Sequence, residues 1–364
     1  MVQRLFSKRF FLSFLTSLFS CFFLLFNVFG EWIYFENHLH STDSHLFSRL
    51  PTYTSYSRSY DPKGIQTLKD LARNSGIQGI AITDHNTISH WFDPVFSSST
   101  DLILLRAMEW TNMFGGHATL IAFDAKDQAE AIVPPHPAGR VGEKDYQEMM
   151  EEVHRRNGLV IINHPKSFYF FHQWPDNIYD ADGIELNFLS WMHPQETIEW
   201  WQEELRQGKK LLLLGGSDYH VGGKTVSLPF QSLNLVWVKE RTEEALLDAL
   251  RKGRVQVIKQ KESLAVLKGM FVIKESSTYE MGDSVLLSPL QSILLQLQVS
   301  RGKGRRLMVY SRSSSFEVEN IESDDFSWGT VYRPQAPFDF LRLELWQGDQ
   351  LEMVSNPIYF NTSQ

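Results

Sequence analysis

The sequence predicts an α/β fold, either a parallel barrel or a doubly wound sheet, followed by a small all-β, sandwich-like domain. Between about residues 31 and 260, short apolar runs alternate with segments of helical periodicity, a pattern typical of parallel strands joined by helices. After about residue 261, short alternating strands are separated by Gly, Ser, Asn and Pro, and no convincing helix follows. We therefore expect a barrel-type domain over 31–260 and a β-sandwich domain over 261–364.

One helix–strand unit recurs through the first part. Apolar residues at helical spacing in 65–72 end near Gly76, a glycine suited to a helix C-cap, and an apolar run follows at 77–83. Thr242, followed by two acids, is the expected N-cap of the last helix. The unit recurs in the ranges 143–163, 194–214 and 242–258, with Gly158, Gly208 and Gly253 between helix and strand.

Residues 1–30 form a separate segment. Arg4, Lys8 and Arg9 precede the uncharged apolar stretch 10–29, as in an export signal, and the stretch is nearly long enough to span a bilayer. We expect either a cleaved signal peptide or an uncleaved membrane anchor, and hence a periplasmic or extracellular protein, membrane-anchored in the second case. Cys21 is the only cysteine, so a mature chain would have no thiol for catalysis, metal binding or disulfides.

The charge balance argues against extended nucleic-acid binding. The formal net charge is −8, and outside the extreme N-terminus there is no block of Lys and Arg. We therefore expect a small-molecule substrate; the sequence leaves the oligomeric state open.

Histidines and acids stand at the ends of the apolar runs. Because the carboxyl ends of parallel strands meet at one edge of a sheet, these side chains are expected to converge. Nitrogen and oxygen donors of this kind suit Zn, Fe or Mn, and a carboxylate can bridge two ions. The residues are His38, His40, Asp84, His85, Glu109, His117, His164, Asp218 and His220.

Each of these residues has a simpler explanation when it is taken alone. His38 and His40 could lie on the surface, Asp84 could cap a helix, and His117 or His164 could be hydrogen-bonded core histidines. A shared metal site explains all of them together. His45 is expected to join the group, with Asp43 as the competing candidate. Glu185 and Asn187 are expected to support it from behind, and His154 to be solvated surface.

The order of these motifs resembles the polymerase-and-histidinol-phosphatase (PHP) superfamily of metallohydrolases. The matching pieces are His38-x-His40, Thr-Asp-His at 83–85, a strand-end Glu109, an isolated His117, His-Pro at 164–165 and Ser-Asp-x-His at 217–220. The resemblance implies a distorted seven-stranded (β/α)7 barrel that holds two to three divalent ions.

The resemblance also implies a distribution of ligands. His38, His40, Glu109 and Asp218 would hold the first ion, and Glu109 would bridge to a second held by His117 and His164. The third would be held by His45, His85 and His220. Short pieces near the C-terminus, at 282–283, 332–333 and 355–359, resemble the carbaryl-hydrolase-like branch of the superfamily.

The expected reaction is hydrolysis of a small phosphoester by a metal-bridging hydroxide, with Asp218 or His220 assisting proton transfer. Lys166, directly after His-Pro, is the candidate contact to the substrate phosphate. The aromatic stretch 168–174 supports a different substrate, an aryl ester or carbamate, although those rings could equally pack the barrel rim. A non-catalytic envelope binding protein with structural metals is the third hypothesis.

Overall fold

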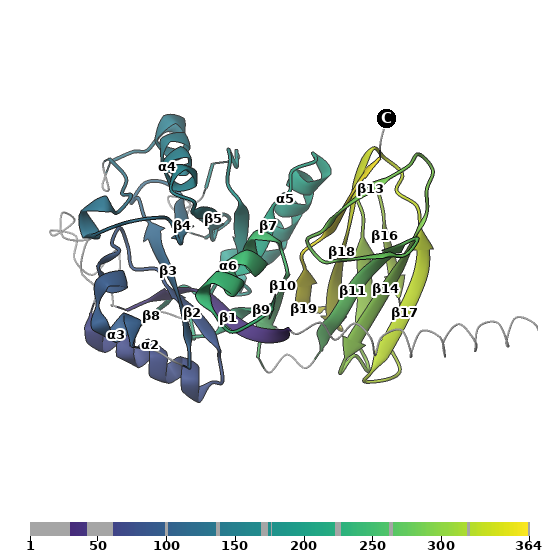
Figure 1. Cartoon of the computed structure of the whole chain (residues 1–364), viewed down its shortest axis with the longest axis horizontal. Helices are drawn as coiled ribbons and strands as arrows, with labels where there is room; N and C mark the ends of the chain where they lie inside the picture. The colour runs from purple at the N-terminus through teal and green to yellow at the C-terminus, as the bar shows by residue number, and fades with distance from the viewer. Residues whose placement is uncertain are drawn as a thin grey trace, which may run out of the picture.

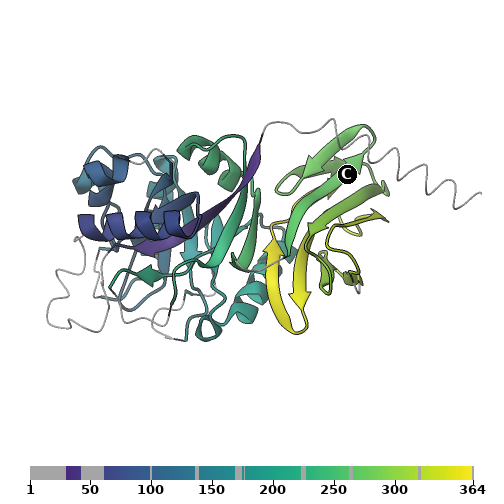
Figure 2. The same cartoon turned by 90° about the horizontal axis from the view of Figure 1, so that it is seen from below.

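The computed structural model describes residues 30–41, 61–98, 101–135, 139–168, 174–175, 177–222, 227–261, 265–318 and 321–362. The half of the chain that contains both helices and strands lies beside a half that is made of strands (Figure 1). Apolar side chains from the two halves join in continuous buried clusters, so the halves pack against each other over an apolar core. Figure 2 shows the same arrangement from below.

The first half is built on a sheet in the order β9-β1-β2-β3-β4-β5-β6-β7. β1, β2 and β3 are mutually parallel, as are β5, β6 and β7, while β4 runs antiparallel to both its neighbours. β9 also runs antiparallel to β1, so the sheet is mainly, but not wholly, parallel. The strands are β1 (Glu31–His40), β2 (Gly79–Ile82), β3 (Ile103–Trp110), β4 (His117–Ile121), β5 (Leu159–Asn163), β6 (Gly183–Leu186), β7 (Leu212–Gly215), β8 (Tyr219–His220), β9 (Gln231–Val238) and β10 (Val255–Gln260).

The helices of this half begin and end close to the predicted positions. Asp61 caps α2 by accepting a hydrogen bond from the backbone N–H of Lys63, and the predicted Thr242 cap accepts one from Ala245. Gly76 has a left-handed φ of 61° just after α2, as a C-terminal glycine should. The helices are α2 (Pro62–Asn74), α3 (Pro94–Ser97), α4 (Glu143–Arg155), α5 (Pro194–Arg206) and α6 (Glu243–Arg251), with 3-10 turns η2 (Ser89–Phe92), η3 (Gln128–Glu130) and η5 (Ser190–Met192).

Two buried asparagine side chains satisfy the free side of β7. The amide of Asn234, on β9, accepts a hydrogen bond from Gly215 N at 2.7 Å and donates to Gly215 O at 2.8 Å. Asn356, from the C-terminal half, does the same for Leu213 and also donates to Val255 O on β10. Side-chain amides thus take the place of a neighbouring strand, because an unpaired buried peptide group would be costly.

The second half contains two sheets that enclose a common apolar core. One has the order β12-β11-β14-β17, and the other continues from β10 through β19 to β18, β20 and β13, with β15 and β16 at its side. The strands are β11 (Val266–Lys274), β12 (Ser277–Glu280), β13 (Ser284–Leu287), β14 (Ile293–Ser300), β15 (Arg306–Tyr310), β16 (Ser315–Val318), β17 (Phe326–Tyr332), β18 (Phe338–Gln347), β19 (Gln350–Ser355) and β20 (Ile358–Thr362).

The predicted fold class is confirmed: a mixed α/β part built mainly on parallel strands precedes a mainly antiparallel β part. The boundary between 260 and 261 stays a prediction, because β10 pairs with β19 and one sheet runs through both parts. No helix within the described ranges is long and apolar enough to cross a membrane. The apolar stretch 10–29 lies outside those ranges.

Candidate metal centre

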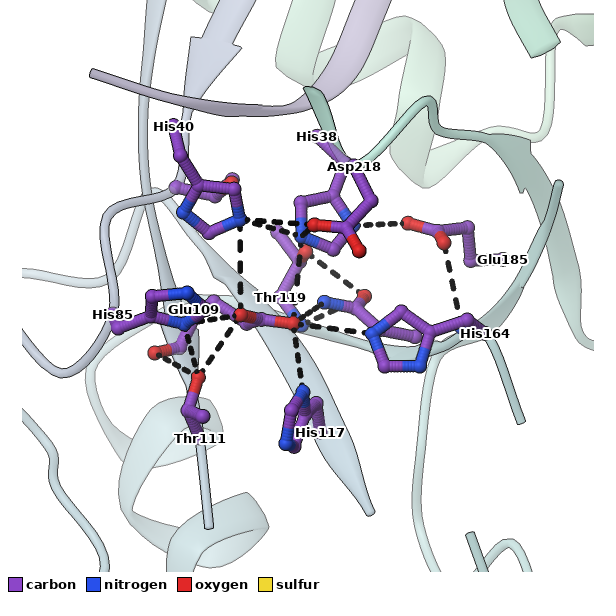
Figure 3. Close-up of polar contacts among 12 residues, drawn as sticks. His38, His40, His85, Glu109, Thr111, His117, Thr119, His164, Glu185 and Asp218 are labelled. Carbon is purple, nitrogen blue, oxygen red and sulfur yellow. Dashed lines mark hydrogen bonds and ion pairs between the residues drawn. The ribbon is translucent and has the colours of Figure 1, made fainter. Parts of the chain in front are cut away.

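Seven of the predicted donors meet at one edge of the barrel sheet, as Figure 3 shows: His38, His40, His85, Glu109, His117, His164 and Asp218. His38 and His40 end β1, His85 follows β2, Glu109 stands near the end of β3 and His164 follows β5. His117 is the first residue of β4, and it reaches the same edge because β4 runs in the opposite direction. The register confirms this placement, since His117 pairs with Asn163 at the end of β5. Asp218 and His220 follow β7, and β8 pairs with the end of β1.

Glu109 is the centre of the cluster. Its Oε1 lies 3.4 Å from His38 Nε2, 3.3 Å from His117 Nδ1 and 3.4 Å from His164 Nε2. Its Oε2 lies 2.6 Å from His85 Nδ1 and 3.8 Å from His40 Nε2. One buried carboxylate therefore faces imidazoles from four strands or strand ends, as a bridging ligand would.

Three overlapping groups of donor atoms could each hold one ion, with the atoms of each group within 4.8 Å of one another: His38–His40–Glu109, Glu109–His117–His164 and His40–His85–His220. The first two groups share Glu109, and the first and third share His40. All seven of these residues are among the ligands that the PHP resemblance implies, and Asp218, the other implied ligand of the first ion, is in none of the three groups. His45 and its competitor Asp43 lie outside the described residues.

Asp218 stands beside the first group. Its Oδ1 lies 3.5 Å from His38 Nε2 and 3.3 Å from His40 Nε2. Its side chain is 21% exposed, more than that of any other donor in the cluster, so solvent reaches the site there. Asp218 and His164 both have positive φ, 52° and 28°, an uncommon backbone state for such residues that the surrounding structure must hold in place.

The charges of the site show why an ion fits. Burial would raise the pKa of Glu109, but the imidazoles of His117, His85 and His38 lower it well below its usual value. Burial lowers the pKa of His40 well below its usual value, and its neighbours His220 and His85 lower it further. Glu109 is thus held as a carboxylate and His40 as a neutral imidazole, the states in which each binds metal. Burial opposes the charged form of His38, but Glu185, Glu109 and Asp218 raise its pKa well above its usual value, so an ion held there would displace a proton.

The third group consists of three closely packed imidazoles. His40 stacks on His220 with ring centroids 4.0 Å apart and on His85 at 4.3 Å. His85 Nε2 and His220 Nε2 lie 3.3 Å apart. The donor nitrogens of these three imidazoles lie within 4.8 Å of one another. A bound divalent ion would be coordinated by their lone pairs at once, so the residues present fit a metal.

Several residues behind the ligands hold them in position. Glu185, as predicted, accepts a 2.6 Å hydrogen bond at Oε2 from His38 Nδ1, which turns Nε2 of that ring toward the cluster. Asp84 accepts hydrogen bonds from the backbone N–H and the hydroxyl of Ser41, at the end of β1, at 2.7 and 2.6 Å. Asp84 therefore fixes the strand end that carries His40 and does not cap a helix. The predicted partner Asn187 is buried and accepts from Leu189 N.

Three further supporting residues were missed by the sequence analysis. Thr111 and Asn163 donate to the two oxygens of Glu109, at 2.9 and 3.0 Å. Glu36 accepts from the backbone N–H groups of His38 and Ser217, and burial raises its pKa to about 8. Each lies within two residues of a predicted ligand. The spacing of two along β1 could have placed Glu36 on the face of His38.

Other predicted residues lie elsewhere or have other contacts. Lys166 places Nζ 4.6 Å from the centre of the Trp200 ring on α5. His154 is not simply solvated, because it pairs with Asp182 at 2.9 Å. Trp174 is buried against Gly116 and Tyr146, so this ring of the aromatic stretch packs the rim. Phe168 is 68% exposed, and 169–173 lie outside the described residues.

Comparison with known proteins finds a similar solved structure but no matching family model. No protein-family model and no curated protein matches the sequence. A solved structure from Bacteroides vulgatus ATCC 8482, described as a two-domain protein containing a predicted PHP-like metal-dependent phosphoesterase, is similar with a TM-score of 0.44 and 16% identity. The similarity covers 90% of this chain and 95% of that one. The case for a metal centre therefore rests on the side chains themselves.

Proposed function

We propose that this chain is a metal-dependent hydrolase of the PHP type that cleaves small phosphoesters. The observation that carries the proposal is the sharing of Glu109 between two three-donor groups, with His40 shared by a third. Catalytic zinc sites usually have three protein ligands and an open position, whereas structural sites have four. The groups around Glu109 and His85 have the catalytic pattern, which argues against purely structural metals.

The roles of the residues follow from their positions. His38, His40, Glu109, His117, His164, His85 and His220 would hold two to three ions of Zn, Mn or Fe, with Asp218 beside the first. Divalent ions in such a site lower the pKa of bound water and polarise the bond under attack. Asp218, the most exposed donor, is the residue best placed to pass a proton to a leaving group, with His220 next to it at 3.7 Å.

Metal analysis and a substrate panel test the proposal together. Purified protein should contain at least two divalent transition ions per chain after reconstitution and should hydrolyse p-nitrophenyl phosphate or bis-p-nitrophenyl phosphate. Chelation should abolish the activity, and adding back Zn, Mn or Fe should restore it. A chain that binds only traces of metal after reconstitution would overturn the assignment, and one that binds metal without hydrolysing any ester would support the non-catalytic alternative.

An aryl ester or carbamate remains the second candidate substrate, because of two exposed rings. Phe114 is 50% exposed and lies on the loop that leads into His117 at the start of β4, while the exposed Phe168 follows His164. These loops adjoin two ligands of one proposed ion. Large exposed apolar groups beside a catalytic centre would favour an uncharged aromatic substrate. Including p-nitrophenyl acetate and an aryl methylcarbamate in the panel distinguishes this candidate from phosphoesters.

We also propose that residues 1–30 direct export to the periplasm or the cell exterior. The support is the basic start followed by the uncharged stretch 10–29. Expression of the full chain, followed by cell fractionation and mass measurement of its N-terminus, tests this. A product cleaved near residue 30 indicates a signal peptide, an intact membrane-bound product indicates an anchor, and an intact protein in the cytoplasm contradicts both.

A further inference from the structure

A cavity lies at the opposite end of the barrel from the histidines. It has a volume of about 340 Å³ and is lined by residues at the amino ends of β5, β6 and β7, by the end of α6 and by part of the C-terminal half. Figure 1 shows α6 and β7 on the side of the barrel that faces β10 and β19. Its volume falls within the range of small-molecule sites in proteins.

Positively charged residues outnumber negatively charged ones in the lining of this cavity. Lys210, Arg251 and Lys252 line it, and Asp182 is its one acidic lining residue. Asp182 is already engaged, because its Oδ2 accepts from Val160 N at 2.8 Å and pairs with His154 at 2.9 Å. The cavity therefore has a positive balance that its own acid does not offset.

Within the described residues, two of the three cations have only uncharged partners. Lys210 donates to the Ser284 hydroxyl at 2.8 Å and lies 5.6 Å from the centre of the Tyr359 ring. Arg251 donates to the backbone carbonyl of Asn157. Lys252, by contrast, is paired with Asp248 at 2.7 Å. Lys210 and Arg251 thus bring two positive charges to one cavity with no carboxylate beside them in the described part of the chain.

Apart from Asn356, the remaining side chains that line the cavity are apolar or aromatic. Leu159, Leu212 and Leu250 come from the barrel side, and Pro357 and the ring of Tyr359 come from the C-terminal half. A ligand that matches both features needs an anionic head and an apolar body. Two uncompensated cations match a phosphate-type dianion better than a single negative charge.

We propose that this cavity is a second binding site, separate from the metal centre, for a small organic anion with a phosphate-type head and an apolar body. Lys210 and Arg251 bind the head, and Leu159, Leu212 and Tyr359 contact the body. The segment 355–359, which the sequence analysis singled out, contributes one wall. The proposal does not depend on the proposed hydrolase activity.

Calorimetric titration of the full chain with phenylphosphonate tests this site, because the P–C bond resists ester hydrolysis. Phenylphosphonate should bind both to chelator-treated protein and to the Glu109→Gln variant, whereas neutral benzyl alcohol should not bind. Lys210→Ala and Arg251→Ala should each weaken the binding to metal-free protein by about tenfold or more. Lys209→Ala is the matched control, because it removes the same charge from a lysine that is outside the lining and paired with Glu204.

The outcomes separate the two sites. Binding that disappears on chelation and is unaffected by Lys210→Ala belongs to the metal centre and overturns the proposal. Equal weakening by Lys209→Ala and Lys210→Ala would indicate a general charge effect and would also overturn it. If a variant has a lowered melting temperature, Lys210→Gln and Arg251→Gln, which keep most of the side-chain volume, replace the alanine variants in the same titration. No binding to folded, metal-free protein contradicts the proposal outright.

Discussion

Buried charged and polar groups occur in both halves of the molecule, but their balance differs. In the C-terminal half Arg342 pairs with Glu344 at 2.7 Å, and Arg305 pairs with Glu352 at 3.0 Å. Each of these cations has its own carboxylate. In the barrel half, imidazoles from several strands converge on one carboxylate, Glu109.

The difference separates structural polarity from a ligand site. A closed buried pair is complete, and breaking it leaves an uncompensated charge. A convergent set of imidazole nitrogens around one carboxylate is the kind of donor arrangement that holds a divalent cation. The comparison predicts that added metal should stabilise the barrel cluster and leave the Arg342 and Arg305 pairs unaffected.

The Glu109→Gln variant is the most direct test of this difference between the two halves. Gln keeps the size of Glu but loses the charge and one acceptor oxygen that a bridging ligand needs. We expect bound metal to fall together with activity, and turnover efficiency to drop by more than about a hundredfold. Elemental analysis and phosphoester hydrolysis measure the two effects.

His154→Ala is the control for this change, since His154 pairs with Asp182 away from the cluster. It should retain both metal and activity. A Glu109→Gln protein with full metal occupancy and turnover would show that Glu109 does not bridge.

The second prediction concerns the junction between the halves. Asn356→Ala removes three hydrogen bonds to buried backbone groups of Leu213 and Val255. The backbone N–H of residue 356 still donates to Val255 O, but the N–H and C=O of Leu213 lose these partners, which should cost about 2–4 kcal/mol of unfolding free energy. Urea denaturation measures it, with the exposed Gln66→Ala on α2 expected to change stability by less than about 0.5 kcal/mol. Equal stability of the two variants would show that Asn356 does not complete β7.

The third prediction tests Glu185 as a positioning residue. Glu185→Gln weakens the acceptor that orients His38, so metal affinity should fall by about ten- to a hundredfold while the fold remains intact. A matched control is Glu196→Gln, because Glu196 also pairs with a histidine, His193, at 2.8 Å, but on the exposed surface. Metal affinity from competition with a chromogenic chelator, together with melting temperature, separates the two. Unchanged affinity in Glu185→Gln would limit its role to packing.

The sequence predicted the elements better than their directions. Residues 159–163 are a strand as predicted, and the ends of α4, α5 and α6 fall close to the expected positions. The reversal of β4 could not be predicted, because alternation along a strand is the same whichever way the strand runs. The roles of Asn234 and Asn356 depend on distant backbone groups of β7, which no local pattern indicates.

The candidate site could likewise be predicted from the sequence only in part. Ligands at strand ends were predictable because the topology brings strand ends together, and Glu185 was predictable for the same reason. Thr111 and Asn163 contact Glu109 through side chains whose targets are set by tertiary packing. The sequence analysis chose Lys166 as a phosphate contact because it is close to His164 in the sequence. Its position over the Trp200 ring depends on where α5 lies, which the sequence does not indicate.

The smallest expected effect distinguishes the two substrate classes. If the substrate is a phosphoester, Lys166→Ala removes a charged contact to the phosphate and should lower kcat/KM by about tenfold, whereas hydrolysis of p-nitrophenyl acetate should be unchanged. If the substrate is an uncharged aryl ester, Phe168→Ala should raise KM for the acetate, and Lys166→Ala should change nothing. Metal content is measured in both variants, because the two residues lie close in sequence to His164. Loss confined to Phe168→Ala would replace the phosphoester assignment with the aryl ester one.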